Sequence, residues 1–450
     1  MTFPWNYINE RQRETVDRLT QSGEERGIVW WKIGEGKTRI ALCWAAKLLK
    51  DEPPPCRVLI VCSPDAIRQW KDEAVLCPWI DSSCLDFLSY GMLTSESTQW
   101  LINRMLIEKK IKAVIVDELW LFKNVKAKRT QAISRLTHML PALGLSGSMV
   151  TARNIEDIYG QAFAVGLNNV IAKSLTDFRT QYCISFKSFG GLAYTARKGA
   201  LEQILQKLAP YVDAYFPPPA REAKFLAQTV DPTPQQKTLI ESLTNDYFAE
   251  LDSGELEIKN SAVLINKIQQ VSDGIIIDGQ GNHSLVQSSK FDRTLDLCND
   301  LFNAGERVII WCAFKASLDQ IVKALGKEAT SLSSHTTFDF AGWKRGNYKA
   351  CVATVGSGAS LNDFANVQYA IIYSVPFNYR ALQQALGRTD RKTSTHSIAY
   401  YYLMQTADTM DKEIYSALKI TQYVEETVIS ASTQVVANFM KNKGFIGKKK

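Results

Sequence analysis

Short runs of apolar, mostly β-branched residues recur along this chain, and stretches with helical spacing separate them. In the first third of the chain, helical spacing is present at residues 37–50 and 65–76. Nearly continuous apolar strands that alternate with helices are typical of a parallel sheet that helices cover on both faces. The strands expected in this part lie at residues 27–31, 57–62, 84–89, 112–117 and 142–146.

The same alternation returns after residue 285, where strands are expected at residues 307–312, 349–354, 367–373 and 397–403. The chain between the two parts has few strand signals but contains amphipathic stretches at residues 200–208, 235–251 and 262–271. The sequence therefore predicts an α/β fold with two parallel-sheet lobes and a mainly helical insertion between them. The expected divisions are residues 1–165 for the first lobe, 166–284 for the insertion, 285–425 for the second lobe and 426–450 for a C-terminal helix and basic tail.

Composition narrows the classes of protein to which the chain can belong. Of its 450 residues, 46% are hydrophobic and 22% are charged, which is typical of globular domains and not of a disordered chain. No apolar run reaches the ~18 residues that a membrane-spanning helix needs, and the N-terminus lacks the pattern of a signal peptide. Nine cysteines without a C-x-x-C pair favour reduced core thiols over disulfides or a zinc site. We therefore expect a soluble intracellular protein with no membrane partner.

The net charge of +7 is concentrated at one end of the chain. Residues 441–450 contain five lysines and no acidic residue, which leaves about +2 for the rest of the chain. Such a tail either contacts phosphates or only keeps the terminus soluble. Overall charge is therefore weak support for a nucleic-acid partner, which has to be inferred from the individual motifs.

A glycine-rich segment lies between the first expected strand and the helix that follows it. Residues 33–38 read I-G-E-G-K-T. Glycines let backbone N–H groups turn toward a polyphosphate, and the N-terminus of the helix adds its dipole. A lysine at this place reaches the β- and γ-phosphates of a nucleotide, and the hydroxyl of the next residue binds Mg²⁺. We therefore expect Gly34, Gly36, Lys37 and Thr38 to bind ATP, with Thr38 as a ligand of Mg²⁺.

Two adjacent acidic residues, Asp117 and Glu118, end an apolar strand about 80 residues after Lys37. An acidic pair at a strand end suits two roles. Asp117 binds the metal, directly or through water, and Glu118 polarises the attacking water. Alone, such a pair is often a solvated turn. In this order after a phosphate-binding loop, it indicates an ATP-hydrolysing site.

Two arginines, Arg388 and Arg391, lie three residues apart at the expected start of a helix in the second lobe. Guanidinium groups in this arrangement could stabilise charge on a transferring phosphoryl group. An isolated R-x-x-R is more often a solvated basic turn, so this interpretation depends on the motifs around it.

Together these motifs resemble the superfamily-two helicase-related ATPases and, within them, the Swi/Snf-type DNA translocases. The likeness runs from about residue 8 to residue 420. Residues 117–124, D-E-L-W-L-F-K-N, are similar to the D-E-A-H-x-x-K-N box, whose trailing Lys-Asn is characteristic of the Swi/Snf group. Gln12 stands where the family has its adenine-reading glutamine. Residues 58–64, followed by Trp70, resemble a motif that touches the tracked DNA strand in the family.

Further motifs extend the resemblance through both lobes. Residues 146–148, S-G-S, stand where the family has a T-G-T coupling motif. Ser289-Lys290 and residues 307–314 resemble the opening of its second core domain, and residues 354–362, with Gly358, resemble its glycine-rich motif. The final motifs, W-N-P and Q-x-x-x-R-x-x-R, are matched by Phe377, Asn378, Gln384, Arg388 and Arg391.

The resemblance implies two RecA-like lobes with ATP in the cleft between them. Residues of the first lobe would hold Mg·ATP, Glu118 would activate water, and Arg388 and Arg391 would complete the site. Gln12, Gly358 and Gln384 would also contact the nucleotide. It further implies double-stranded DNA, gripped without sequence specificity through its phosphates, and translocation instead of strand separation.

The chain departs from the family pattern at several places. Trp31-Lys32 replaces an acidic pair, and Trp31 stands where the full phosphate-loop pattern begins with glycine. Leu119 and Trp120 replace the alanine and histidine of the acidic box, Met149 replaces a proline, and Ser360 replaces a glycine. None of these changes removes a residue expected to bind or hydrolyse ATP, so hydrolysis is expected to be intact.

Two other functions remain open at the level of sequence. A strand-separating DNA or RNA helicase would share these motifs, although the residues beyond 420 are too few for an accessory domain. An ATP-gated nucleic-acid-binding module would share them as well, because changed coupling motifs could leave a switch without movement. A basic cluster after the acidic box, with Lys123 and Lys126 among its members, is either a phosphate contact or a solvated turn. The compact size favours a viral or bacterial source.

Overall fold

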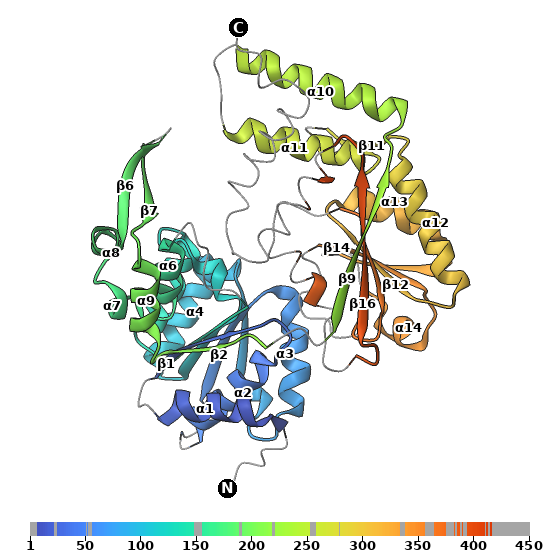
Figure 1. Ribbon diagram of the computed structural model, residues 1–450. Coiled ribbons are helices and arrows are strands. Elements are labelled where there is room, and N and C mark those ends of the chain that lie inside the picture. Colours follow the sequence, from blue (N-terminus) through green and yellow to red (C-terminus); the bar gives the residue numbers. More distant parts are fainter. Residues whose placement is uncertain are drawn as a thin grey trace. The chain divides into compact units, whose positions relative to one another are not determined.

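The computed structural model divides the chain into two compact units, Met1–Pro218 and Pro219–Lys450. Each is described by itself, and both are drawn in Figure 1. None of the described helices combines the length and low polarity that crossing a membrane requires. The structure describes residues 7–21, 25–50, 52, 56–147, 155–188, 191–217, 221–252, 258–278, 280–333, 338–355, 364–374, 382, 385–387, 389, 394–409, 411–412 and 415.

The first unit is built on a parallel sheet, as the apolar runs predicted. Its described strands follow the order β3–β2–β4–β5–β1–β8, and every described pairing is parallel. Five of these strands were expected from the sequence, and their observed bounds differ from the expected ones by at most one residue. The strands are β1 (Arg26–Trp31), β2 (Arg57–Cys62), β3 (Leu85–Ser89), β4 (Ile111–Val116), β5 (Ala142–Ser146) and β8 (Val212–Tyr215).

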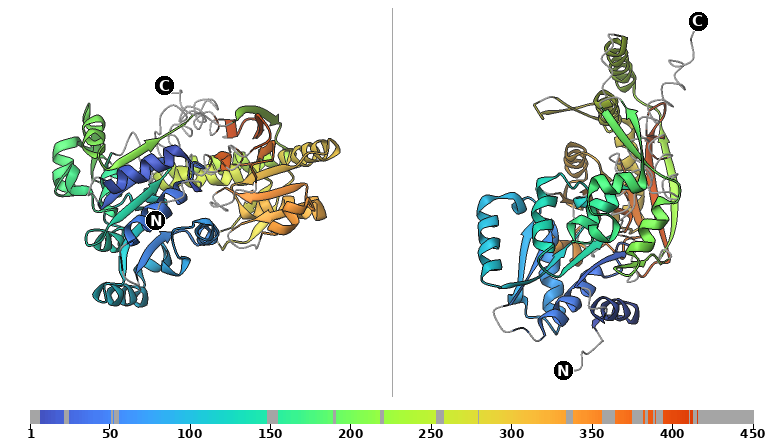
Figure 2. Two further views of the ribbon diagram at one scale, coloured as in Figure 1. Left: turned by 90° about the horizontal axis from the view of Figure 1, so that it is seen from below. Right: turned by 90° about the vertical axis from the view of Figure 1, so that its left-hand side faces the viewer.

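Helices cover both faces of this sheet because alternate residues of each strand point to opposite sides. On one side, Val29 and Trp31 pack with α1, α2 and α3, whereas on the other side Ile28 packs with α4, α5, α6, α8 and α9. These layers can be followed in Figures 1 and 2. The helices are α1 (Glu10–Gln21), α2 (Lys37–Leu49), α3 (Pro64–Leu76), α4 (Glu96–Ile107), α5 (Lys128–Thr137), α6 (Glu156–Ala164), α7 (Asn168–Ile171), α8 (Leu175–Tyr182) and α9 (Ala200–Leu208).

The second unit repeats this architecture. Its described strands follow the order β13–β14–β12–β15–β16–β9, again with parallel pairing throughout. Helices α12 and α13 pack on one face of this sheet, and α11 and α14 pack on the other. The elements are β9 (Glu222–Val230), α10 (Pro234–Asp252), α11 (Ile258–Ser272), α12 (Ser289–Asn303), β12 (Val308–Cys312), α13 (Lys315–Leu325), β13 (Ala329–Leu332), α14 (Phe340–Arg345), β14 (Ala350–Thr354), β15 (Tyr369–Ile372) and β16 (Ile398–Thr406).

Residues 166–284, predicted as a mainly helical insertion, contain five helices in their described part and are shared between the two units. Strand β8 completes the first sheet beside β1, and β9 completes the second beside β16. The remaining described strands of this region belong to small antiparallel pairs. Strands β6 (Cys183–Ser188) and β7 (Gly191–Ala196) form one hairpin, and β10 (Ile275–Ile277) pairs with β11 (His283–Leu285). The division at Pro218 therefore falls inside the predicted insertion.

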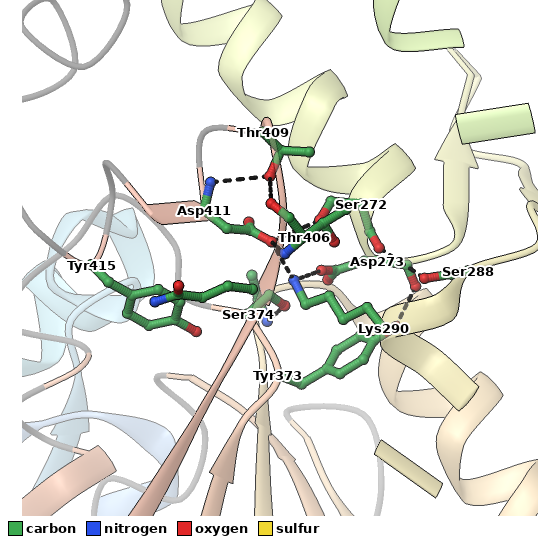
Figure 3. A network of polar contacts seen from close by, with 12 residues as sticks. Ser272, Asp273, Ser288, Lys290, Tyr373, Ser374, Thr406, Thr409, Asp411 and Tyr415 are labelled. Carbon is green, nitrogen blue, oxygen red and sulfur yellow. Dashed lines mark hydrogen bonds and ion pairs between the residues drawn. The ribbon is translucent and has the colours of Figure 1, made fainter. Parts of the chain in front are cut away.

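A buried ion cluster joins three distant segments of the second unit (Figure 3). The ammonium group of Lys290, which begins α12 with Ser289, lies 2.9 Å from Asp273 Oδ1 and 3.0 Å from Asp411 Oδ2. All three side chains are almost completely buried. Ser272 donates a further hydrogen bond to Asp411, and the backbone N–H of Thr406 does the same. The cluster thus fastens the residues after β16 to α11 and α12.

The charges of this cluster are unequal, with one ammonium group between two carboxylates. Burial raises the pKa of Asp273 to about 6, although the charge of Lys290 acts in the opposite direction. Burial alone would lower the pKa of Lys290, but the charges of Asp273 and Asp411 outweigh it and the pKa is raised. Lys290 therefore stays charged, and its charge offsets the free-energy cost of burying the two carboxylates in the core.

Replacing Lys290 by methionine tests this cluster. Lys290→Met should lower the free energy of unfolding by about 3–5 kcal/mol, because it leaves two buried carboxylates without a neutralising charge. Without Lys290 the pKa of Asp273 would rise further above its unfolded value, so the variant should lose stability as the pH rises. Urea denaturation followed by circular dichroism should show a larger deficit at pH 8 than at pH 5.

Lys315→Met is the matched control, because Lys315 forms an exposed pair with Asp319 one helical turn away on α13. It should change stability by less than about 0.5 kcal/mol. Equal deficits in the two variants, or a deficit that does not depend on pH, would contradict the role given to Lys290.

Candidate nucleotide-binding site

The predicted ATP-binding residues of the first unit meet at one edge of its sheet. Strands β4, β5 and β1 are neighbours, so the residues that follow their carboxyl ends lie close together. These residues are Asp117 after β4, Gly147 after β5 and the loop before α2. A Cβ atom added at Gly147 would lie 2.8 Å from Ile33 Cγ1 and 4.0 Å from Lys37 Nζ. The predicted coupling motif and the phosphate loop are therefore in direct contact.

The loop before α2 has the backbone that a phosphate site requires. Gly34 and Gly36 have φ values of 90° and 84°, a backbone conformation that residues with a Cβ atom rarely adopt. Gly36 is also the N-cap of α2, where no side chain caps the helix and no acidic residue occupies the first turn. Helix α2 begins with Lys37 and Thr38, so the positive end of its dipole lies at these residues and can attract an anion.

Gln12 supports this loop from α1. Its amide Nε2 donates to the carbonyl of Glu35 at 3.0 Å and to that of Gly36 at 3.4 Å. Its Oε1 accepts from the backbone N–H of Asn9 at 3.0 Å, which fixes the orientation of the amide. A Cβ at Gly36 would lie 2.3 Å from Nε2, so any side chain at this position would displace the Gln12 amide. The structure places Gln12 against the loop. That Gln12 also recognises adenine stays a prediction.

The side chain of Lys37 extends back over the start of the loop that precedes α2. Its Nζ donates to the carbonyl oxygens of Trp31 at 3.0 Å and Lys32 at 3.3 Å. Its positive charge also acts to lower the pKa of Asp117, which shows that the two predicted residues are close enough to interact. The basic and acidic parts of the predicted site therefore belong to one constellation.

Asp117 is held in place by three groups from three segments. The indole N–H of Trp70 on α3 donates to Oδ2 at 3.0 Å, and the backbone N–H of Glu118 donates to Oδ1 at 2.9 Å. The hydroxyl of Tyr90 donates to the backbone carbonyl of Asp117 at 3.1 Å. Burial, followed by the negative charge of Glu118, raises the pKa of Asp117 to about 6. A nearby cation would favour the ionised form.

Glu118 occupies the left-handed backbone region, with φ 44°, which is uncommon for residues other than glycine. The indole N–H of Trp120 donates to its Oε2 at 2.6 Å. Trp120, which replaces the histidine of the family box, thus orients the carboxylate predicted to polarise water. Leu119, the other replaced position, is fully buried.

Trp31, a third departure from the family pattern, also donates its indole N–H to a carboxylate. The acceptor is Oδ1 of Asp213 on β8, at 2.8 Å. Arg11 and Arg18 of α1 bind the same carboxylate at 2.6 and 2.9 Å. This cluster around the buried Asp213 attaches α1 to the sheet and so holds Gln12 against the loop. The sequence alone indicated neither Asp213 nor the roles of these tryptophans.

The residues present fit a magnesium ion held jointly with phosphates. Thr38 and Asp117 offer the hydroxyl and carboxylate oxygens that Mg²⁺ prefers. In the part of the chain that the structure describes, no group of three or more His, Cys, Asp or Glu side chains could hold a metal by itself. Mg²⁺ is usually bound by one or two protein oxygens together with the phosphates of a nucleotide, and Thr38 and Asp117 would supply the protein oxygens.

The predicted site residues of the second unit, Gly358, Gln384, Arg388 and Arg391, lie outside the described residues. Thr389, between the two arginines, is described and 1% exposed. The basic cluster after the acidic box is exposed, and its member Lys123 lies 3.5 Å from Asp157. The structure thus leaves both interpretations of that cluster open.

Comparison with known proteins identifies part of the second unit. Residues 289–393 match the family described as helicase conserved C-terminal domain. For residues 289–393, this match bears out the predicted likeness to helicases. No curated protein matches the chain.

Two of the solved structures that are similar to the chain come from one organism. One is the Sulfolobus solfataricus SWI2/SNF2 ATPase core in complex with dsDNA, at 15% identity and a TM-score of 0.39, covering 98% of this chain and 96% of that one. The other is the ATPase core domain of the same organism, at 15% identity and a TM-score of 0.37, covering 94% and 91%.

The acidic pair yields the first test of the site. Glu118→Gln keeps the size of the side chain but removes the charge that polarises water, so turnover of ATP should fall at least ~100-fold while ATP still binds. Lys37→Ala should instead weaken nucleotide binding itself. Steady-state hydrolysis together with binding of a fluorescent ATP analogue separates the two effects.

Glu96→Gln, an exposed change in the first turn of α4, serves as the control and should leave both quantities unchanged. Near-normal turnover in Glu118→Gln would show that the acidic box is assigned to the wrong residues.

Proposed function

We propose that this helicase-related ATPase is a translocase that uses ATP to move along double-stranded DNA. The observation that carries the proposal is the first-unit constellation of phosphate loop, Lys37, Asp117 and Glu118. It occurs in a chain whose second unit carries a helicase C-terminal domain. A hydrolysis site joined to such a domain is the combination used by ATP-driven nucleic-acid motors.

In this proposal each residue of the first unit has one task. The loop and the N-terminus of α2 bind the phosphates, and Lys37 exchanges its carbonyl partners for phosphate oxygens. Thr38 and Asp117 hold Mg²⁺, which supplies charge neutralisation when it is bound. Glu118, oriented by Trp120, accepts the proton of the attacking water. Arg388 and Arg391 are assigned to the charge that develops on the transferring phosphoryl group.

Duplex DNA is proposed as the track because of the Lys-Asn pair that ends the acidic box, Lys123-Asn124. Recognition would be through phosphates and so without sequence specificity. Action inside a cell is part of the same proposal, since all nine cysteines are free thiols. The strand-separating helicase and the ATP-gated binding module remain the alternatives.

The track can be identified by hydrolysis measurements with no nucleic acid, single-stranded DNA, duplex DNA and RNA at several salt concentrations. Duplex DNA should stimulate turnover most, and its affinity should fall steeply with salt, because each neutralised phosphate releases counterions. Base sequence should change the affinity little. Turnover that does not rise with any nucleic acid would favour the ATP-gated module.

Movement requires a separate measurement. A translocase should displace the third strand of a triplex in an ATP-dependent manner and leave a plain duplex paired. The Glu118→Gln variant is the control and should displace nothing. Efficient unwinding of a forked duplex without triplex displacement would favour the helicase instead.

A further inference from the structure

Strand β9 forms one edge of the second sheet and runs beside β16 (Figure 1). Among the strands that the structure describes, only β16 pairs with it. Seven of its nine residues are exposed and none is buried. The other described edges of the two six-stranded sheets, β3, β8 and β13, have only four or five residues and include buried ones. A long exposed edge strand presents backbone groups that can pair with another chain.

The backbone groups on the outer side of β9 can be assigned from its contacts with β16. The N–H of Glu222 donates to the carbonyl of Ser397 at 2.9 Å, and the carbonyl of Val230 accepts from the N–H of Ala407 at 2.8 Å. Because successive residues of a strand turn these groups to alternate sides, those of Leu226 at the centre also face β16. The N–H and carbonyl groups of the alternate residues therefore point away from the sheet. These residues are Ala223, Phe225, Ala227 and Thr229.

The side chains of β9 give this edge little protection against pairing. Its two charged residues, Glu222 and Lys224, lie at its start, and residues 225–230 read F-L-A-Q-T-V. Phe225 and Leu226 are each 38% exposed, and the Phe225 ring stacks on Tyr401 with 5.0 Å between the centroids. Natural edge strands are usually protected by charges, proline or short length. An uncharged segment of this kind without proline instead favours pairing with another strand.

We infer that β9 is the interface for a second copy of this chain, whose own β9 pairs with it in the antiparallel direction about a two-fold axis at Leu226. Ala223 is then opposite Thr229 of the second copy. Phe225 is opposite Ala227, so the outward backbone groups of each strand face those of the other. The contact uses the same surface on both chains and therefore closes at two copies. This inference goes beyond the proposed function and does not depend on it.

The side chains of β9 are compatible with this register. The large ring of Phe225 faces the small Ala227, and Leu226 meets its own copy on the axis. Lys224 faces Gln228, and the other charged residue of β9 faces a valine, so no charges of the same sign are opposed.

Other registers and other proteins satisfy fewer of these conditions. A shift of the pairing by one residue sets outward backbone groups against residues that face β16, and a shift by two leaves residues at the strand ends unpaired. A second copy meets the conditions of length, backbone direction and charge at once, which favours it over a strand of another protein.

Disulfide trapping tests the register. Residues opposite each other at a non-hydrogen-bonded position of an antiparallel pair have Cα atoms about 4.5 Å apart, within the range for a disulfide. Leu226 would occupy such a position with its own copy, so Leu226→Cys should form an intermolecular disulfide when oxidised glutathione is added. Non-reducing electrophoresis should show a species of twice the chain mass of 50.5 kDa, which a reductant removes.

Phe225→Cys is the matched control, because Phe225 is exposed to the same extent but would lie diagonally from its own copy, at about 7–8 Å. It should cross-link no more than the unmodified chain, whose native cysteines are buried apart from the half-buried Cys84. Equal cross-linking of the two variants, or none in Leu226→Cys, would overturn the proposal.

A proline tests the backbone pairing without a cross-link. The N–H of Ala227 points away from β16, so Ala227→Pro removes a donor of the interface and keeps the pairing with β16. One strand pair makes a small interface, so the unmodified chain should associate weakly and exceed the monomer mass only near ~100 μM. In sedimentation equilibrium, association should be at least ~10-fold weaker in Ala227→Pro and unchanged in Ala227→Ser.

Circular dichroism checks that both Ala227 variants fold. If the unmodified chain stays monomeric at that concentration, or if Ala227→Pro associates as well as Ala227→Ser, the two-fold pairing through β9 is wrong.

Discussion

Burial of parallel strands on both faces is the constraint from which the site follows. Every side chain along such a strand must pack under a helix, so polar groups can emerge only where strands end. In the first unit, the carboxyl ends of β1, β4 and β5 are adjacent and carry the phosphate loop, the acidic pair and Gly147. Three segments that are far apart in sequence therefore assemble one site without any dedicated binding domain.

The same constraint explains which strands could be predicted. Central strands such as β2 and β12 are nearly continuous apolar runs, because both of their faces are buried. Strand β9 lies at the edge of the second sheet and is exposed along most of its length, so it has no such run. Strand β8 has only four residues, one of which is the buried Asp213. Both strands form by pairing with strands from distant parts of the chain. No local sequence pattern reveals such pairing.

The sequence predicted the site residues that belong to a motif with a fixed spacing. It did not predict the residues that form hydrogen bonds to them and hold them in place. Gly36 and Lys37 follow a strand and open a helix, a local arrangement that the sequence states directly. Trp70 is 1% exposed, and its bond to Asp117 joins residues 47 positions apart. The bond of Trp31 to Asp213 joins residues 182 positions apart. Such contacts follow from the packing of the sheet, not from any motif.

Three tryptophans in and near the site share one kind of contact. Trp70, Trp120 and Trp31 each donate an indole N–H to a carboxylate, those of Asp117, Glu118 and Asp213 respectively. A neutral donor orients a carboxylate without cancelling its charge. At Asp213, Arg11 and Arg18 supply positive charge, so the negative charge of this carboxylate is neutralised within the cluster.

The acidic pair is arranged differently. The charge of Lys37 acts to lower the pKa of Asp117, but burial and the negative charge of Glu118 still raise it to about 6. A divalent cation would offset both the burial and the repulsion between the two acids. The indoles therefore keep the acidic pair in position and leave its negative charge intact, whereas at Asp213 two arginines neutralise the carboxylate.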